Sequence, residues 1–149
     1  MKSKKSITIL MADDDADDRD MTRDAFSESH LVNDLRFVED GVQLMDYLKR
    51  RGKYADPNIS PRPGVILLDL NMPKKDGREA LAEIKADPEV QEIPVIVLTT
   101  SKEEEDILRS YRLHANSYIT KPVTFAALVH VVTELGKYWL EIVELPEAV

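Results

Sequence analysis

The chain has 149 residues, of which 43% are hydrophobic and 32% charged, with a formal net charge of −8 and no cysteine. These values fit one globular domain with a hydrophobic core, and they exclude disulfide frameworks, thiol nucleophiles and thiolate metal sites. No apolar run approaches the roughly 20 residues of a membrane span or forms a secretory signal, so we expect a cytoplasmic protein. The acidic balance argues against direct binding of nucleic acid.

The first half of the chain alternates between strand-like and helix-like segments. We expect a strand at 7–12, a helix at about 17–28, a weakly alternating strand at 35–38 that suits a sheet edge, and a helix at about 42–48. A stretch rich in proline and glycine follows at 50–64, which is long for a connection of about 2–6 residues in a compact α/β fold. Its basic residues are Arg50, Arg51, Lys53 and Arg62, preceded by Lys49. A solvated insertion and a contact with a partner are both open for this loop.

The second half continues the alternation. The run Val65–Ile66–Leu67–Leu68 is short and continuously apolar, which indicates a strand buried on both faces. Helices are expected from about Arg78 to 87, at 101–111 and at about 124–143, with further strands at 93–98 and 117–120. Strands alternating with helices predict a doubly wound α/β fold with a five-stranded parallel sheet and helices on both faces. The chain is expected to form one domain over 1–149, with its core at about 7–143.

Polar side chains follow four of the five predicted strands, at the point where each strand ends. They are Asp13, Asp14 and Asp15 after the first strand, Asp69 and Asn71 at the end of the third, Thr99, Thr100 and Ser101 after the fourth, and Lys121 after the fifth. Because the carboxyl ends of parallel strands meet at one edge of the sheet, these groups should converge there.

Several carboxylates in one crevice repel each other unless a cation lies among them. A hard divalent ion such as Mg²⁺ meets that need with oxygen ligands. A neighbouring lysine and threonine could then hold the oxygens of a phosphoryl group, whose transfer depends mainly on positioning and charge neutralisation. A carboxylate can itself be the nucleophile and form an aspartyl phosphate.

The order Asp13–Asp14, Asp69, Thr99 and Lys121–Pro122 resembles the receiver domain of bacterial response regulators over essentially the whole chain. Within that family it resembles in particular the single-domain regulators paired with bacterial and cyanobacterial phytochromes, because of the loop at 50–64 and the residues around Asp69 and Thr99. The resemblance implies a flavodoxin-like, receiver-type fold. It also implies a phosphoacceptor in two-component signalling, with a sensor histidine kinase as partner and Mg²⁺ as cofactor.

The resemblance also implies a role for each matching residue. Asp69 is expected to be the phosphoacceptor, with Lys121 pairing with the phosphoryl group or, at rest, with Asp69. The expected metal ligands are Asp14 directly, Asp13 mostly through water, Asp69, and Asn71 through its backbone carbonyl. The remaining roles fall to Thr99 as the switch hydroxyl, Tyr118 as the aromatic that changes rotamer with it, and Pro122 after a cis peptide bond.

Three other functions fit these residues less well. A calcium loop beginning at Asp13 is rejected, because its sixth position is Asp18 instead of glycine and its twelfth is Asp24 instead of glutamate. A haloacid-dehalogenase-type phosphatase needs a second aspartate two residues after Asp69, where this chain has Asn71. A receiver-like module that is never phosphorylated is expected to lack an acidic residue of the Asp13–Asp14 pair, Asp69 or Lys121, and none of these is missing.

The last predicted helix carries two apolar stripes. Its first stripe, expected to face the sheet or to extend that seam past it, consists of Phe125, Leu128, Val132, Leu135, Trp139 and Ile142. The second stripe, Ala126, Val129, Gly136, Leu140 and Val143, is left over on a side that should be polar. An exposed apolar stripe usually marks a protein contact, so we expect a homodimer through this helix, with the kinase as the alternative partner. No effector domain is expected, so signalling should proceed through protein contacts.

Overall fold

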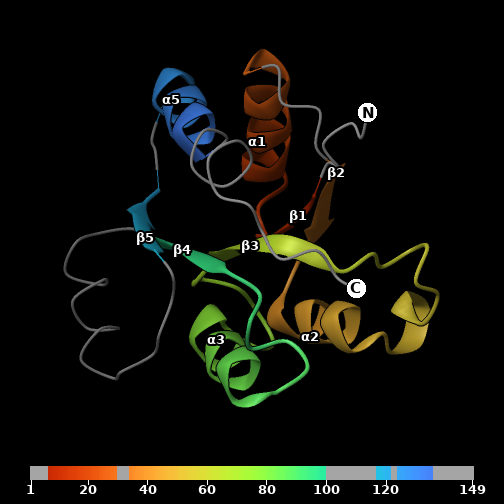
Figure 1. Cartoon of the computed structure of the whole chain (residues 1–149). Coiled ribbons are helices and arrows are strands. Elements are labelled where there is room, and N and C mark those ends of the chain that lie inside the picture. The colour runs from red at the N-terminus through yellow and green to blue at the C-terminus, as the bar shows by residue number, and fades with distance from the viewer. Residues whose placement is uncertain (1–6, 30–33, 100–116, 122–123, 136–149) are drawn as a thin grey trace.

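The computed structural model describes residues 7–29, 34–99, 117–121 and 124–135, apart from the side chains of Thr99, Ser117 and Tyr118 (Figure 1). The strands are β1 (Thr8–Ala12), β2 (Asp34–Val38), β3 (Pro63–Asp69), β4 (Val95–Thr99) and β5 (Ser117–Thr120). The helices are α1 (Ala16–Glu28), α2 (Gly41–Lys49), α3 (Gly77–Ala86) and α5 (Phe125–Leu135), with a short 3-10 helix η1 (Gly52–Tyr54). The helix expected at 101–111 and the part of the last helix beyond Leu135 lie outside the described residues. Within the described ranges, no helix has the length and apolar character to cross a bilayer.

The five strands form one parallel sheet in the order β2-β1-β3-β4-β5, with β2 at an edge as expected. Helices α1 and α5 cover one face and α2 and α3 cover the other (Figure 1). The predicted doubly wound fold is therefore confirmed. The chain moves outward from β1 to β2 and then crosses back to β3, so the crevice where ligands bind in such sheets lies between the ends of β1 and β3.

Alternation along the central strands divides the core into two layers. Leu10 of β1 and Ile66 of β3 pack under α2 and α3, whereas Ile9 and Leu67 pack under α1 and α5. Each of these four side chains is at most 4% exposed. Such continuous burial explains why β3 reads as an uninterrupted apolar run.

Three of the helices begin at an aspartate that caps them directly after a strand or loop. Asp15, Asp40 and Asp76 each accept a hydrogen bond from a backbone N–H in the first turn of α1, α2 and α3. Such caps each contribute about 1 kcal/mol to helix stability. They fix where each helix starts relative to the carboxyl edge of the sheet.

Helix α5 differs in part from its prediction. Val132 is buried, and Leu128 and Leu135 pack against the same core layer as expected. Phe125, the first residue of the helix, is 42% exposed and is therefore not part of the core. Val129, expected on the free outer stripe, is half-buried against that layer, because α5 lies beside α1 as well as over the sheet.

The stretch at 50–64 is anchored at several points. Tyr54 and Ser60 are buried, Ser60 Oγ donates to the Tyr54 carbonyl at 2.7 Å, and Tyr47 Oη donates to the Pro61 carbonyl at 2.8 Å. Because the stretch leads into the start of β3 and Asp69 ends that strand, the two lie at opposite ends of the sheet.

Candidate functional site

Two buried aspartates stand at the ends of the adjacent central strands. Asp13 follows β1 and is fully buried, and Asp69 is the last residue of β3 and is 3% exposed. The backbone of Asp13 is held on both sides, since its N–H donates to the Val38 carbonyl at 3.0 Å and its carbonyl accepts from Arg19 Nη1 at 2.9 Å. The topology of the sheet therefore places two carboxylates in one crevice.

The two carboxylates are oriented in the same way. Asp13 Oδ1 accepts a hydrogen bond from the Asp15 N–H at 2.9 Å, and Asp69 Oδ1 accepts one from the Asn71 N–H at 3.1 Å. In each case the donor lies two residues further along the chain, which is the Asx-turn pattern that aspartate favours at turns. One oxygen of each group is thereby fixed by the backbone, and Oδ2 is left to face the crevice.

Lys121, directly after β5, connects the cluster. Its Nζ lies 3.1 Å from Asp13 Oδ2, 3.3 Å from Asp69 Oδ2 and 2.5 Å from Asp18 Oδ2. The pairing of Lys121 with Asp69 was expected, but the contact with Asp18 was not. The sequence indicated only that Asp18 lies in the acidic first turn of a helix, and its reach to Lys121 depends on how α1 sits over the edge of the sheet.

Burial and charge shift the protonation equilibria of this cluster. Burial raises the pKa of Asp13 to about 6, against the opposing effects of the Asp15 N–H and Lys121. Burial likewise raises the pKa of Asp69 above its ordinary value. Burial alone would lower the pKa of Lys121, but its hydrogen bond to Asp18 and the charges of Asp69 and Asp13 raise it overall. Carboxylates held in a buried crevice at this cost in free energy are typical of functional sites.

The donor set fits a hard divalent cation. Carboxylate oxygens of Asp13, Asp14 and Asp69 lie within 4.8 Å of one another, and Asp14 is exposed at the mouth of the crevice. Within the described part of the chain, Asp13 Oδ2 is buried and accepts no well-aligned hydrogen bond, although Lys121 is its ion-pair partner. One lysine among these carboxylates and that of Asp18 leaves an excess of negative charge. Oxygen ligands, an open side and uncompensated negative charge are what Mg²⁺ requires.

The loop between β3 and α3, which carries Asn71, is held by two glycines. The Gly77 N–H donates to the Leu70 carbonyl at 2.9 Å, and a Cβ at Gly77 would lie 2.6 Å from the Asp69 carbonyl oxygen. The Gly41 N–H donates to the Lys75 carbonyl at 3.0 Å, and a Cβ at Gly41 would lie 2.1 Å from that oxygen. Only glycine permits such close approaches. The loop is thus fixed between the end of β3 and the start of α2.

The other expected site residues are placed only in part. Thr99 ends β4 beside Thr120 of β5, and Tyr118 pairs with Val97 in the sheet, but the side chains of Thr99 and Tyr118 are not described. Thr99 therefore lies at the carboxyl end of β4 and Tyr118 lies within β5, as expected. The switch roles of both residues stay predictions. The expected cis-proline Pro122 and the dimer candidates Gly136, Leu140 and Val143 lie outside the described residues.

Comparisons with known proteins cover almost the entire chain. The sequence model of the response regulator receiver domain matches residues 9–133. Response regulator Rcp1 of Synechocystis sp. is 44% identical over 140 residues, covering 94% of this chain and 93% of that protein. The crystal structure of the phosphorylated cyanobacterial phytochrome response regulator RcpA is similar with a TM-score of 0.85 and 43% identity, over 96% of this chain and 100% of that one. The Mn²⁺-bound form of Rcp1 gives a TM-score of 0.82 at 43% identity, over 95% and 99%.

Proposed function

We propose, from the premise that this chain belongs to the response regulator receiver domain family, that Asp69 is the residue that accepts its phosphoryl group. Membership of the family makes the chain a phosphoacceptor response regulator of two-component signalling and disfavours the phosphatase. The presence of Asp69 and Lys121 argues against the unphosphorylated module. The observation that carries the assignment of Asp69 is its position at the end of β3, with Oδ1 fixed by the Asn71 N–H and Oδ2 facing Lys121.

In the proposed reaction, Asp69 Oδ2 attacks the phosphorus of a phosphohistidine on a sensor kinase. The new O–P bond forms as the P–N bond breaks, and the electron pair leaves with the imidazole nitrogen of the donor. Asp13, Asp14, Asp69 and the Asn71 carbonyl are the groups that would hold Mg²⁺. When bound, that ion supplies positive charge against the phosphoryl oxygens.

Lys121 changes partner in this proposal. At rest its ammonium group bridges Asp13, Asp18 and Asp69. Once Asp69 carries a phosphoryl group, Lys121 keeps its place beside the crevice and pairs with a phosphoryl oxygen instead. Thr99 would accompany this change as the switch hydroxyl, with Tyr118 following. The chain would contribute to its own phosphorylation and dephosphorylation and to no other chemistry.

We propose a phytochrome-type histidine kinase as the donor, acting in the cytoplasm. Support comes from RcpA, which is a cyanobacterial phytochrome response regulator and is 43% identical to this chain. Output would pass through protein contacts and not through nucleic acid, in keeping with the net charge of −8.

The proposed dimer uses the outer side of the last helix, where Phe125 and Ala126 are exposed. Sedimentation of the Ala126→Glu, Leu140→Glu double variant tests it. A wild-type monomer at high concentration, or a variant that stays dimeric, contradicts the dimer.

The test of the assignment is phosphotransfer from a labelled phytochrome-type kinase to the wild type, Asp69→Asn and Asp20→Asn. Asp20 lies on the exposed side of α1, so its variant controls for the loss of one carboxylate outside the site. Label should reach the wild type and Asp20→Asn in the presence of Mg²⁺, and should be absent from Asp69→Asn. Undiminished labelling of Asp69→Asn would exclude Asp69 as the acceptor.

A further inference from the structure

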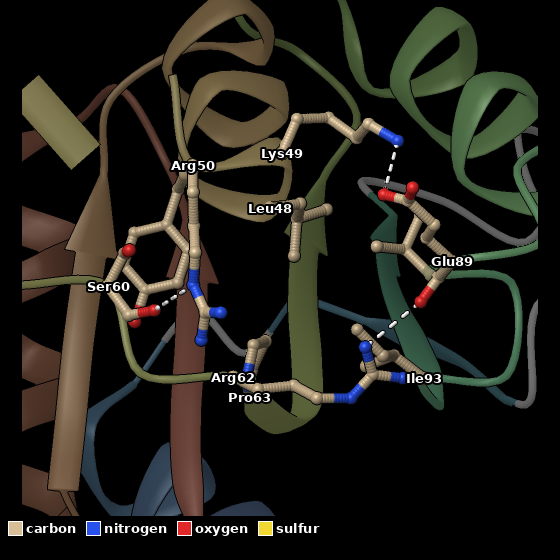
Figure 2. A pocket seen from close by; sticks show the side chains of 10 residues that line it. Leu48, Lys49, Arg50, Ser60, Arg62, Pro63, Glu89 and Ile93 are labelled. Atoms are coloured by element: carbon tan, nitrogen blue, oxygen red, sulfur yellow. Dashed lines mark hydrogen bonds and ion pairs between the residues drawn. The ribbon is translucent and has the colours of Figure 1, made fainter. Parts of the chain in front are cut away.

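A second pocket lies at the opposite end of the sheet from Asp69, with a volume of about 170 Å³ (Figure 2). It is enclosed by the end of α2, the segment that enters β3, and the connection from α3 to β4. Apolar side chains form its inner walls, and charged side chains stand at its border. The apolar ones are Leu48, Pro63, Val90 and Ile93, and the charged ones are Lys49, Arg50, Arg62 and Glu89.

The three cations at this pocket are not equally neutralised. Lys49 Nζ forms ion pairs with Asp87 and Glu89, both at 2.7 Å. Arg50 Nε donates to the Ser60 carbonyl at 3.4 Å, and Arg62 Nη1 donates to the Glu89 carbonyl at 2.9 Å. Among the residues that the structure describes, neither guanidinium forms an ion pair with a carboxylate. Both guanidinium groups therefore retain N–H groups that can donate hydrogen bonds to a ligand at the border of the pocket.

Backbone geometry places Arg50 there at a cost in free energy. Arg50 ends α2 in the left-handed conformation, with φ 54° and ψ 53°, where helices usually have glycine. Figure 2 shows its side chain running toward Arg62 and Pro63, while Arg62 extends along the other border toward Ile93. The wall that carries Ser60 is held by the hydrogen bonds of the buried Ser60 hydroxyl, so the pocket is preformed.

We propose that this pocket binds an acidic segment of a partner protein, with one apolar side chain inside and flanking carboxylates on Arg50 and Arg62. Guanidinium groups match carboxylates in a bidentate geometry. The volume is below the roughly 300–1,000 Å³ of small-molecule sites. It admits a single aliphatic side chain, which would contact the apolar part of a mixed polar and apolar lining. The net charge of −8 repels long polyanions such as nucleic acids, whereas a short acidic segment carries only a few charges.

The experiment is a titration of the full ¹⁵N-labelled chain, followed by NMR, with the peptide acetyl-Glu-Glu-Leu-Glu-Glu-amide. Amide shifts are expected at 47–50, 60–63 and 89–93. Replacing the central leucine of the peptide by glycine should weaken binding by about tenfold, because its burial is lost. The double variant Arg50→Glu, Arg62→Glu should lower the affinity for the peptide by about tenfold or more. The double variant Arg50→Gln, Arg62→Gln should also lower this affinity.

The matched control is Arg51→Glu with Lys53→Glu, which makes the same change in net charge on the same loop. Both residues are exposed and neither lines the pocket. This control should bind the peptide within about twofold of the wild type, because Arg51 and Lys53 lie outside the pocket and solvent screens their charges from the bound peptide.

Three results would overturn the proposal. They are an equal loss of binding in the control, a leucine-independent affinity, and displacement of the peptide by inorganic phosphate at lower concentrations than the peptide itself. Phosphotransfer to Asp69 should be unchanged in Arg50→Gln, Arg62→Gln, because the pocket and Asp69 lie at opposite ends of β3. The pocket can therefore fail its test while the proposed function passes, and the reverse also holds.

Discussion

Replacing Asp13 by asparagine should stabilise the metal-free protein. Burial raises the pKa of Asp13 from 3.8 to about 6 in the folded state, a difference of about 2 pKa units. At about 1.4 kcal/mol per unit, the ionised group costs about 3 kcal/mol of folding free energy at pH 7. Asparagine keeps an oxygen for the Asp15 N–H and carries no charge, and Lys121 keeps Asp18 and Asp69 as partners. We expect the free energy of unfolding to rise by about 1–3 kcal/mol, or roughly 3–10 °C in melting temperature.

The pH dependence has a definite sign. A carboxyl group whose pKa is higher in the folded state binds more protons there than in the unfolded chain between about pH 4 and pH 6. The contribution of the Asp13 carboxyl to the stability of the wild type therefore falls as pH rises through that window. Above the window, the full free-energy cost of burying the ionised group is present. The advantage of Asp13→Asn should be largest at pH 7 and fall to about half at pH 5.

The assay is urea unfolding of the wild type, Asp13→Asn and the exposed control Asp20→Asn, in EDTA and in saturating Mg²⁺. The control should stay within about 0.5 kcal/mol of the wild type. Mg²⁺ should stabilise the wild type more than Asp13→Asn, because binding to the folded state adds stability only where the ligand set is complete. If Asp13→Asn is less stable than the wild type in EDTA at pH 7, or if its advantage grows toward pH 5, ionised Asp13 does not cost folding free energy.

Three further outcomes follow from the same geometry. Lys121→Met should lower the free energy of unfolding in EDTA by about 3 kcal/mol in urea melts, because its carboxylate partners lose their cation; a neutral effect would contradict the pairing. Asp14→Asn should change the free energy of unfolding by no more than about 0.5 kcal/mol, because Asp14 is exposed. It should weaken Mg²⁺ binding by about tenfold or more in calorimetry, and unchanged affinity would show that Asp14 is not a ligand. Gly41→Ala should lower the free energy of unfolding by about 1–3 kcal/mol and weaken Mg²⁺ binding, because its Cβ would displace the Lys75 carbonyl and with it the loop that carries Asn71. Normal stability with normal Mg²⁺ affinity would show that Gly41 does not hold this loop.

The position of Asp69 could be predicted from sequence because local pattern determines it. An apolar run that ends in an acid and a turn defines both the strand and its rim residue, and the same holds for Asp13 after β1. The alternation of elements then fixes the parallel sheet, which brings the two residues together.

Contacts between distant elements could not be predicted in this way. The reach of Asp18 to Lys121 depends on the rotation of α1 about its axis, which the weak apolar face of that helix does not define. The exposure of Phe125 depends on where α5 begins relative to the sheet. In both cases the spacing along the chain is compatible with more than one tertiary arrangement, and packing selects one.

The assignment of Asp69 is tested by identifying chemically which residue carries the acyl phosphate. The wild-type chain is phosphorylated by a histidine kinase with Mg²⁺ and reduced with borohydride, which converts an aspartyl phosphate into homoserine. Peptide mass spectrometry then identifies the modified position. We predict homoserine at position 69 alone, in an amount that falls when EDTA replaces Mg²⁺. Homoserine at position 13 or 14, or phosphorylation that leaves position 69 unmodified, would contradict the account.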